Sequence, residues 1–196
     1  MARLVYAAIC SLDGYTEDAT GEFEWAAPDE EVHRAVNQFE RSIGTYLYGR
    51  RMYETMKVWQ DTSSLQDNDV TAEYGAIWRG ADKIVFSRTL TSVDTPRTTI
   101  VTGFDPAGIQ ALKTATDRDL SIGGAELAGI ALAAGVVDEC HLYVIPVTVG
   151  GGKPVFPLGL HANLELVDLQ RFRNGTVHLH YVVNNSATGI TPLPAN

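Results

Sequence analysis

The stretch LSIGGAELAGIALAA, residues 120–134, shows the structural unit from which this fold is built. Its first three residues are typical of a short buried strand, the pair Gly123-Gly124 ends that strand, and residues 125–134 are typical of a helix. A strand that leads through glycines straight into a helix is half of a β–α–β unit, in which the next strand runs parallel to the first. The stretch therefore favours an α/β fold with a parallel sheet.

Strands and helices also alternate before residue 120. One helix start is well marked, because Pro28 precedes Asp29-Glu30-Glu31 and apolar residues then follow at helical spacing. Asp105-Pro106 marks another, with Asp105 as the expected N-cap. The predicted strands are residues 4–10, 45–48, 83–87, 99–102 and 120–122, and the predicted helices are residues 29–41, 50–57, 70–79 and 125–134, with one more helix opened by Asp105.

The last third of the chain changes character. Residues 140–149 are strand-like, residues 164–172 and 176–183 both alternate, and Asn174-Gly175 between those two runs is typical of a hairpin turn. This order predicts a mostly parallel sheet with helices on both faces and an antiparallel hairpin at one edge. We assign residues 1–184 to this single domain and residues 185–196 to a polar tail.

Length and composition limit the classes of protein to which this chain can belong. A chain of 196 residues suits one α/β domain, and its net charge of −9 repels nucleic acid and anionic membranes. Neither a targeting segment nor a run approaching about 20 apolar residues is present, so we expect a cytoplasmic protein without nucleic-acid or membrane partners. Cys10 and Cys140 lie in apolar runs and are expected to be reduced core thiols.

Three predicted strands end in residues that suit phosphate binding. In parallel sheets, ligands bind at the carboxyl ends of the strands, where helix N-termini point free N–H groups outward. An arginine pair alone is typical of a solvated helix face and a glycine pair of a tight turn, but together in an acidic chain they predict a site for a diphosphate and a monophosphate. The residues are Gly49, Arg50 and Arg51, then Ser87 and Arg88, and then Gly123, Gly124, Ala125 and Glu126. The Rossmann fingerprint Gly-x-Gly-x-x-Gly is absent, so an ordinary Rossmann dehydrogenase is not indicated.

These residues belong to motifs that match a known family in the correct order. The motifs are Ser11-Leu12-Asp13-Gly14, Gly49-Arg50-Arg51-Met52-Tyr53-Glu54, Ile122-Gly123-Gly124-Ala125-Glu126-Leu127, and Leu142-Tyr143-Val144-Ile145-Pro146 followed by Gly150-Gly151-Gly152. The chain resembles the dihydrofolate reductase-like superfamily, in the branch that contains the C-terminal reductase domain of the bacterial riboflavin-biosynthesis deaminase-reductase. The resemblance covers about residues 3 to 183.

The resemblance implies an eight-stranded sheet that binds NADPH in extended form, and a homodimer. By motif, the adenosine-side phosphates would be held by Gly49, Arg50 and Arg51, the 2′-phosphate approached by Ser87 and Arg88, and the diphosphate cradled by Gly123, Gly124, Ala125 and Glu126. The backbone around Ala8 and Ile9 would face the nicotinamide. The arginines favour NADPH over NADH, because a 2′-phosphate gains charge-assisted hydrogen bonds that a hydroxyl cannot.

Fewer residues support a prediction of the substrate-binding site. Trp25-Ala26-Ala27-Pro28-Asp29-Glu30 resembles the Trp-x-x-Pro-x-acid run of true dihydrofolate reductases, and by that spacing Glu30 matches the carboxylate that binds the pterin and assists its protonation. Such a carboxylate is expected to be buried, which raises its pKa. The alternative for Glu30 is a charge in the first helical turn. Asp13 is the other candidate acid, with an Asp-Gly turn as its alternative, and Trp25 and Trp59 either stack on a flat substrate or lie in the core.

The leading interpretation is an NADPH-dependent oxidoreductase acting on a flat heterocycle of pyrimidine or pterin type, related to riboflavin biosynthesis. A genuine dihydrofolate reductase and a non-catalytic NADP-binding sensor are the alternatives. The zinc deaminase signature of the bifunctional riboflavin enzyme is absent, so the chain corresponds at most to the reductase half. No metal is expected, since His178 and His180 are predicted to face solvent and His141 stands alone.

Overall fold

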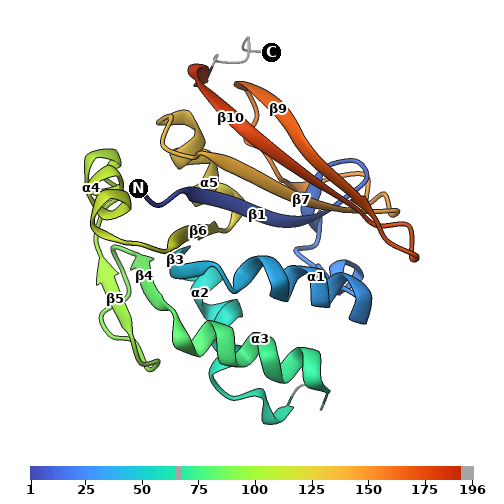
Figure 1. The fold of residues 1–196 in the computed structure, drawn as a ribbon, viewed down its shortest axis with the longest axis horizontal. Helices are drawn as coiled ribbons and strands as arrows, with labels where there is room; N and C mark the ends of the chain where they lie inside the picture. The colour runs from blue at the N-terminus through green and yellow to red at the C-terminus, as the bar shows by residue number, and fades with distance from the viewer. Residues whose placement is uncertain (65–67, 191–196) are drawn as a thin grey trace.

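The central feature of the structure, a computed structural model that describes residues 1–64 and 68–190, is one eight-stranded sheet (Figure 1). Its strands are, in spatial order, β5 (Thr98–Val101), β4 (Asp82–Phe86), β3 (Ile43–Gly49), β6 (Asp119–Gly123), β1 (Leu4–Ser11), β7 (Glu139–Ile145), β10 (Val177–Ile190) and β9 (Leu160–Arg171). The first six are parallel, and β10 is antiparallel to both of its neighbours. The predicted fold class is confirmed.

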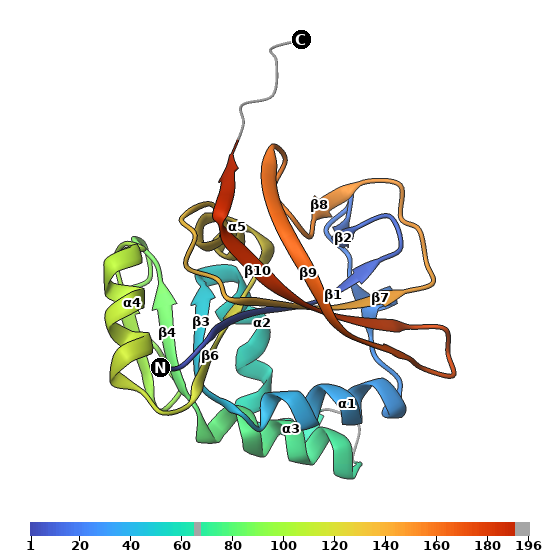
Figure 2. The same ribbon diagram turned by 45° about the horizontal axis from the view of Figure 1, so that its top comes forward.

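Helices cover both faces of the sheet. They are α1 (Glu30–Glu40), α2 (Arg50–Met56), α3 (Asp69–Gly80), α4 (Pro106–Ala115) and α5 (Ala125–Ala133), with short 3₁₀ turns at Glu24–Ala26, Lys57–Gln60 and Thr62–Ser64. One core lies between the sheet and α4 and α5, and includes Leu4, Leu47 and Ile122. The second lies under α1, α2 and α3 and is built around Trp78. In Figure 2, α1 and α3 lie together below the sheet.

Both cysteines lie in the core, as predicted. Cys10 and Cys140 are buried free thiols on the α5 face of the sheet. Burial raises the pKa of Cys10 to about 11 and that of Cys140 to about 12. The protonated form is therefore dominant at neutral pH, which is the behaviour of small apolar side chains rather than of nucleophiles.

Two short strands that sequence patterns do not reveal form a separate antiparallel sheet. They are β2 (Tyr15–Asp18) and β8 (Gly152–Pro154), with Tyr15 opposite Pro154 and Asp18 opposite Gly152. Both segments are too short and too polar for their periodicity to be recognised. Their pairing joins the loop that follows β1 to the loop that follows β7.

Two strand boundaries differ from prediction. The strand expected over residues 140–149 ends at Ile145, because Pro146 has no N–H to continue a ladder. The last strand, expected to end at residue 183, continues to Ile190 and pairs there with the first residues of β9. The predicted polar tail thus begins inside β10, and residues 191–196 lie outside the described residues.

Candidate functional site

Strand order brings the predicted cofactor residues to one edge of the sheet. The strands β4, β3, β6 and β1 are parallel neighbours, so their carboxyl ends lie side by side; we call this region the carboxyl edge. Gly49 is level with Phe86, the residue before Ser87, and Tyr48 is level with Gly123. Segments separated by many residues in the chain are therefore adjacent at the level where ligands of parallel sheets bind.

The helix starts at this edge differ from the others in how they are capped. Helices α1, α3 and α4 each begin with a side chain that accepts backbone N–H groups: Asp29, Asn68 and Asp105. Helices α2 and α5 begin at Gly49 and Gly124, with no side-chain cap. Free N–H groups at a helix start bind anions well. The two uncapped helices are those that follow β3 and β6, in the middle of the sheet.

The three glycines at these helix starts differ in whether the fold requires them. A Cβ at Gly123 would lie 2.8 Å from Cε1 of Tyr48, so the packing of that ring excludes a side chain. Gly124 has φ +89°, a left-handed conformation that favours glycine. Gly49 has φ −73° and no atom within 4 Å of an added Cβ. The fold therefore needs Gly123 and Gly124, whereas it leaves open space in front of Gly49.

Cations line the carboxyl edge. Arg50 pairs with Glu54 at 2.8 Å and donates to the Thr89 hydroxyl at 3.3 Å, which connects α2 to the loop after β4. The Arg51 side chain is 84% exposed, and its Nη1 lies 3.9 Å from Oε1 of Glu126. Lys153, which sequence reasoning missed, places its Nζ 3.7 Å from the same carboxylate. No motif spacing marks Lys153, because the β2–β8 pairing brings it here.

The remaining predicted cofactor residues differ in their exposure to solvent. Ser87 is buried, and its hydroxyl accepts the N–H groups of Thr89 and Leu90, so it shapes the loop after β4. Arg88 beside it is exposed. Ala8 and Ile9 are half-buried on β1 and contact the cores on opposite faces of the sheet.

Asp13 anchors the loop that follows β7. Its carboxylate accepts the N–H groups of Val149 and Gly150, the latter at 2.7 Å. The hydrogen bond with Ser11, followed by these backbone N–H groups, lowers the pKa of Asp13. A carboxylate held ionised in this way accepts hydrogen bonds at neutral pH, which favours the role of loop anchor over that of proton donor.

The substrate-side residues are more exposed than expected. The Glu30 side chain is 69% exposed and pairs with Arg34 one helical turn later, so the expected burial of this carboxylate is wrong. Trp25 is half-buried and its Nε1 donates to the carbonyl of Glu22. Trp59 packs against Tyr74, with ring centroids 4.4 Å apart. The exposure of Glu30 favours the alternative of a first-turn charge over that of a substrate-binding acid.

We expect Glu30→Gln to keep nearly full turnover on the true substrate. An exposed carboxylate paired with Arg34 stabilises the first turn by only about 0.3–1 kcal/mol, so the melting temperature should also change little. Steady-state kinetics and thermal unfolding test this. A fall of about 10²–10⁴-fold in turnover would instead identify Glu30 as the acid. Asp29→Asn is the control, because asparagine keeps the N-cap of α1.

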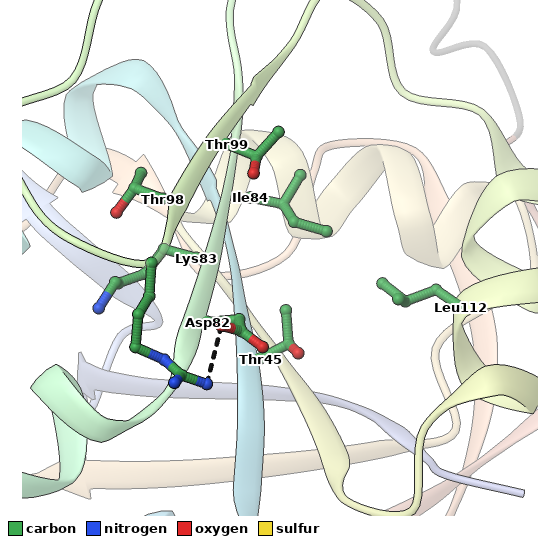
Figure 3. Close-up of a pocket in the computed structure, with 8 residues that line it drawn as sticks. Thr45, Asp82, Lys83, Ile84, Thr98, Thr99 and Leu112 are labelled. Atoms are coloured by element: carbon green, nitrogen blue, oxygen red, sulfur yellow. Dashed lines mark ion pairs between the residues drawn. The ribbon is translucent and has the colours of Figure 1, made fainter.

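A hollow of about 430 Å³ lies at the opposite, amino end of the strands (Figure 3). It is lined by Thr45, Asp82, Lys83, Ile84, Arg97, Thr98, Thr99 and Leu112. Arg97 pairs with Asp82 at 2.9 Å, and Nζ of Lys83 donates to the carbonyl of Trp78. The hollow contains no predicted site residue, and its charged groups are satisfied by the protein itself.

The histidine predictions are corrected by the strand register. His180 lies opposite His141 and His178 lies opposite Tyr143, because β10 pairs with β7. His141 therefore does not stand alone, and the rings of His178 and His180 stack against its ring. Both are half-buried rather than directed to solvent.

Comparison with known proteins identifies the family. The family model described as the RibD C-terminal domain matches residues 2–178. The uncharacterized Bacillus subtilis protein YyaP is 30% identical over 182 residues, which cover 91% of this chain and 94% of that protein. Within residues 1–64 and 68–190, no helix is long and apolar enough to cross a membrane.

Solved structures show the same fold. A putative riboflavin biosynthesis protein from Shewanella sp. PV-4 has a TM-score of 0.72 at 20% identity, covering 94% of this chain and 99% of its own. A diaminohydroxyphosphoribosylaminopyrimidine deaminase/5-amino-6-(5-phosphoribosylamino)uracil reductase from Thermotoga maritima has a TM-score of 0.64 at 13% identity, covering 93% of this chain but 56% of its own. The chain therefore belongs to the RibD C-terminal domain family, a family of reductase-like domains related to riboflavin biosynthesis.

Proposed function

We propose that this protein is an NADPH-dependent reductase that acts on a flat heterocycle of pyrimidine or pterin type. The observation that carries the proposal is the pair of uncapped helix starts at Gly49 and Gly124, beside the arginines of the carboxyl edge. Free N–H groups at helix starts bind phosphate oxygens, and arginines add charge-assisted hydrogen bonds. A dinucleotide with a diphosphate and a 2′-phosphate suits such an extended row of anion-binding groups.

The charge distribution supports the same ligand. The chain as a whole carries a net charge of −9, which repels anions. The carboxyl edge nevertheless gathers Arg50, Arg51, Arg88 and Lys153. The exposed 3.9 Å pair between Arg51 and Glu126 is weak, so Arg51 can turn toward a phosphate at little cost.

When bound, NADPH would supply a hydride, and the chain's own residues would position and shield it. Gly49, Gly124 and the neighbouring arginines would hold the phosphates, while the β1 backbone at Ala8 and Ile9 would support the nicotinamide end. Asp13 would hold the loop that follows β7 near the same edge, through the N–H groups of Val149 and Gly150. These roles fix the orientation of the cofactor, whichever group supplies the proton.

We expect the purified protein to bind NADPH more tightly than NADH, because the arginines of the carboxyl edge gain charge-assisted hydrogen bonds only with a 2′-phosphate. A fluorescence titration with each cofactor tests this. Equal affinities would contradict the 2′-phosphate assignment.

A screen of NADPH oxidation separates the possible activities. Aminouracil, dihydropterin and simple carbonyl compounds would be offered in turn. Steady oxidation with aminouracil or dihydropterin supports the reductase proposed here, and oxidation with dihydropterin alone narrows it to a dihydrofolate reductase. Oxidation with the simple carbonyl compounds alone contradicts the proposed substrate class. NADPH binding without consumption on any heterocycle indicates a sensor and contradicts the proposal.

We expect Gly49→Ser to weaken NADPH binding while leaving the fold as stable or slightly more stable. The open space and ordinary φ at Gly49 accept a side chain, and a serine hydroxyl at an N-cap stabilises the helix by a few tenths of a kcal/mol relative to glycine. The same hydroxyl would occupy the N–H groups that a phosphate needs. Thermal unfolding measures the expected unchanged or slightly raised stability, and cofactor titration measures the expected loss of NADPH affinity. Gly80→Ser, at another position with open space, is the control and should leave NADPH affinity unchanged.

A further inference from the structure

Three potential metal ligands meet on the face of the sheet that α1 covers. Glu139 and His141 alternate on β7, so both point to the same face, and His180 on β10 lies directly opposite His141. One donor atom from each of the three residues lies within 4.8 Å of the others. The Glu139 and His141 side chains are 10% and 8% exposed, and that of His180 is 19% exposed.

The donor atoms converge on one carboxylate oxygen. Nε2 of His180 lies 3.1 Å from Oε2 of Glu139, and Nε2 of His141 lies 3.6 Å from the same oxygen. Within the described residues, Nε2 of His141 is buried and has no hydrogen-bond partner. A buried nitrogen that faces a carboxylate beyond hydrogen-bond distance is costly, unless a cation lies between them.

We propose that Glu139, His141 and His180 form a binding site for a zinc-type divalent cation, with water as the fourth ligand. Imidazole nitrogen and carboxylate oxygen bind zinc at about 2.0–2.2 Å, so neighbouring ligands of a tetrahedral ion lie about 3.3–3.6 Å apart. The distance of 3.6 Å from His141 to the shared oxygen matches this spacing, and that of 3.1 Å from His180 lies slightly below it. Two histidines and one carboxylate with an open fourth position are a donor set that zinc takes in proteins.

Neighbouring side chains already orient these ligands. Nδ1 of His141 lies 3.0 Å from Nε2 of His178, and donation by this Nδ1 leaves the Nε2 lone pair of His141 available. Arg3 donates to the other oxygen of Glu139 at 2.8 Å and leaves Oε2 to face the histidines. Such hydrogen bonds to the far side of a ligand are the usual support of a metal site.

The site requires a small rearrangement to close on an ion. The rings of His141 and His180 are stacked, with centroids 4.1 Å apart and planes at 25°, so each must turn to bring the ion into its own plane. The torsion concerned, χ2 of histidine, is broad and turns at little cost. His141 also stacks on Phe39 of α1, which limits its movement, and so the larger turn falls to the more exposed His180.

The proposed metal site is separate from the carboxyl edge. Glu139 is the first residue of β7, whereas the carboxyl edge lies at the other end of the parallel strands. A bound ion would connect β7 to β10, the strand pair at which the sheet changes from parallel to antiparallel. The inference is therefore independent of the proposed reductase activity.

The test is a titration of the EDTA-treated full chain with Zn²⁺ by calorimetry, and with Co²⁺ by visible absorption, which reports coordination number. We expect one ion per chain, a four-coordinate Co²⁺ spectrum, and a melting temperature raised by Zn²⁺. His180→Gln, which removes a ligand, should lower the affinity by no less than about 100-fold. His178→Gln, which removes a supporting hydrogen bond and a stacked ring but no ligand, should lower it by about 10- to 100-fold. His161→Gln, an exposed histidine of β9, is the matched control and should bind as the wild type does.

Three results would overturn the proposal. They are no saturable Zn²⁺ binding, binding that His180→Gln and Glu139→Gln leave unchanged, and binding that His161→Gln abolishes. Because His180 is partly exposed, its replacement is not expected to unfold the chain. Thermal unfolding of each variant without metal verifies that the fold is intact before affinities are compared.

Discussion

Replacing Arg51 or Arg88 by alanine is expected to weaken NADPH binding by about 1–3 kcal/mol each, while NADH binding barely changes. The physical reason is that an arginine opposite the 2′-phosphate forms a charge-assisted hydrogen bond that the 2′-hydroxyl of NADH cannot replace. Arg51 is 84% exposed, and its pair with Glu126 is 3.9 Å long, so its removal does not disturb the core. Parallel fluorescence titrations with both cofactors measure the effect, which corresponds to about 5- to 150-fold in affinity.

Arg41→Ala is the matched control for this experiment. Arg41 lies at the end of α1 and pairs with Glu73 of α3, away from the helix starts of the carboxyl edge. The substitution Arg41→Ala removes the same positive charge as Arg51→Ala or Arg88→Ala. A loss of cofactor affinity that all three variants share therefore reflects net charge alone. Equal weakening of NADPH and NADH in Arg51→Ala or Arg88→Ala would assign these arginines to the diphosphate or to the fold, and would contradict the 2′-phosphate role.

Glu40→Gln is expected to stabilise the protein increasingly as pH rises, by about 3 kcal/mol between about pH 4 and about pH 8. Glu40 is 6% exposed at the end of α1 and accepts a hydrogen bond from Tyr46 at 2.8 Å. Burial raises the pKa of Glu40 from 4.5 to about 7, against the smaller opposite effect of that hydrogen bond. The folded state therefore binds a proton that the unfolded state releases, so the contribution of Glu40 to stability is present below pH 4.5 and is lost as pH rises through about 7.

Urea unfolding of the two proteins at several pH values measures this difference. The wild-type curve alone is not the readout, because burial lowers the pKa of His141 to about 3 and this changes stability in the opposite sense in acid. Glu73→Gln is the control of opposite sign: Glu73 is hydrogen-bonded to Asn37 and Arg41, which lower its pKa, so its contribution is lost as pH falls. A difference between Glu40→Gln and wild type that does not vary with pH would contradict the buried, protonated Glu40.

The features that sequence predicts well depend on contacts between near neighbours. Asp105 caps α4 through N–H groups only two and three residues later. Asn174-Gly175 turns the hairpin between β9 and β10, with φ +91° at Gly175. Such local interactions depend on a few adjacent residues, and so a single sequence reveals them.

Sequence predicts burial less well where one pattern serves two purposes. The acidic run at Glu30 fits both a substrate-binding carboxylate and a helix start, and the structure shows an exposed first-turn residue. Glu40, in the same helix, is buried although nothing in its neighbours distinguishes it. Whether Glu30 or Glu40 is buried depends on which residues of the sheet and of α3 pack against α1.

By itself, the sequence determined the alternation of strands and helices, the closing hairpin and the placement of glycines and arginines after strands. Because parallel strands share an edge, that order was sufficient to predict the carboxyl edge. The tertiary structure alone decided which residues meet across the chain. Asp13 reaches Gly150, 137 residues later, and His141 meets His180 only through the register of β7 and β10. Such contacts are set by strand order, register and packing over the whole domain, and no local run of residues encodes them.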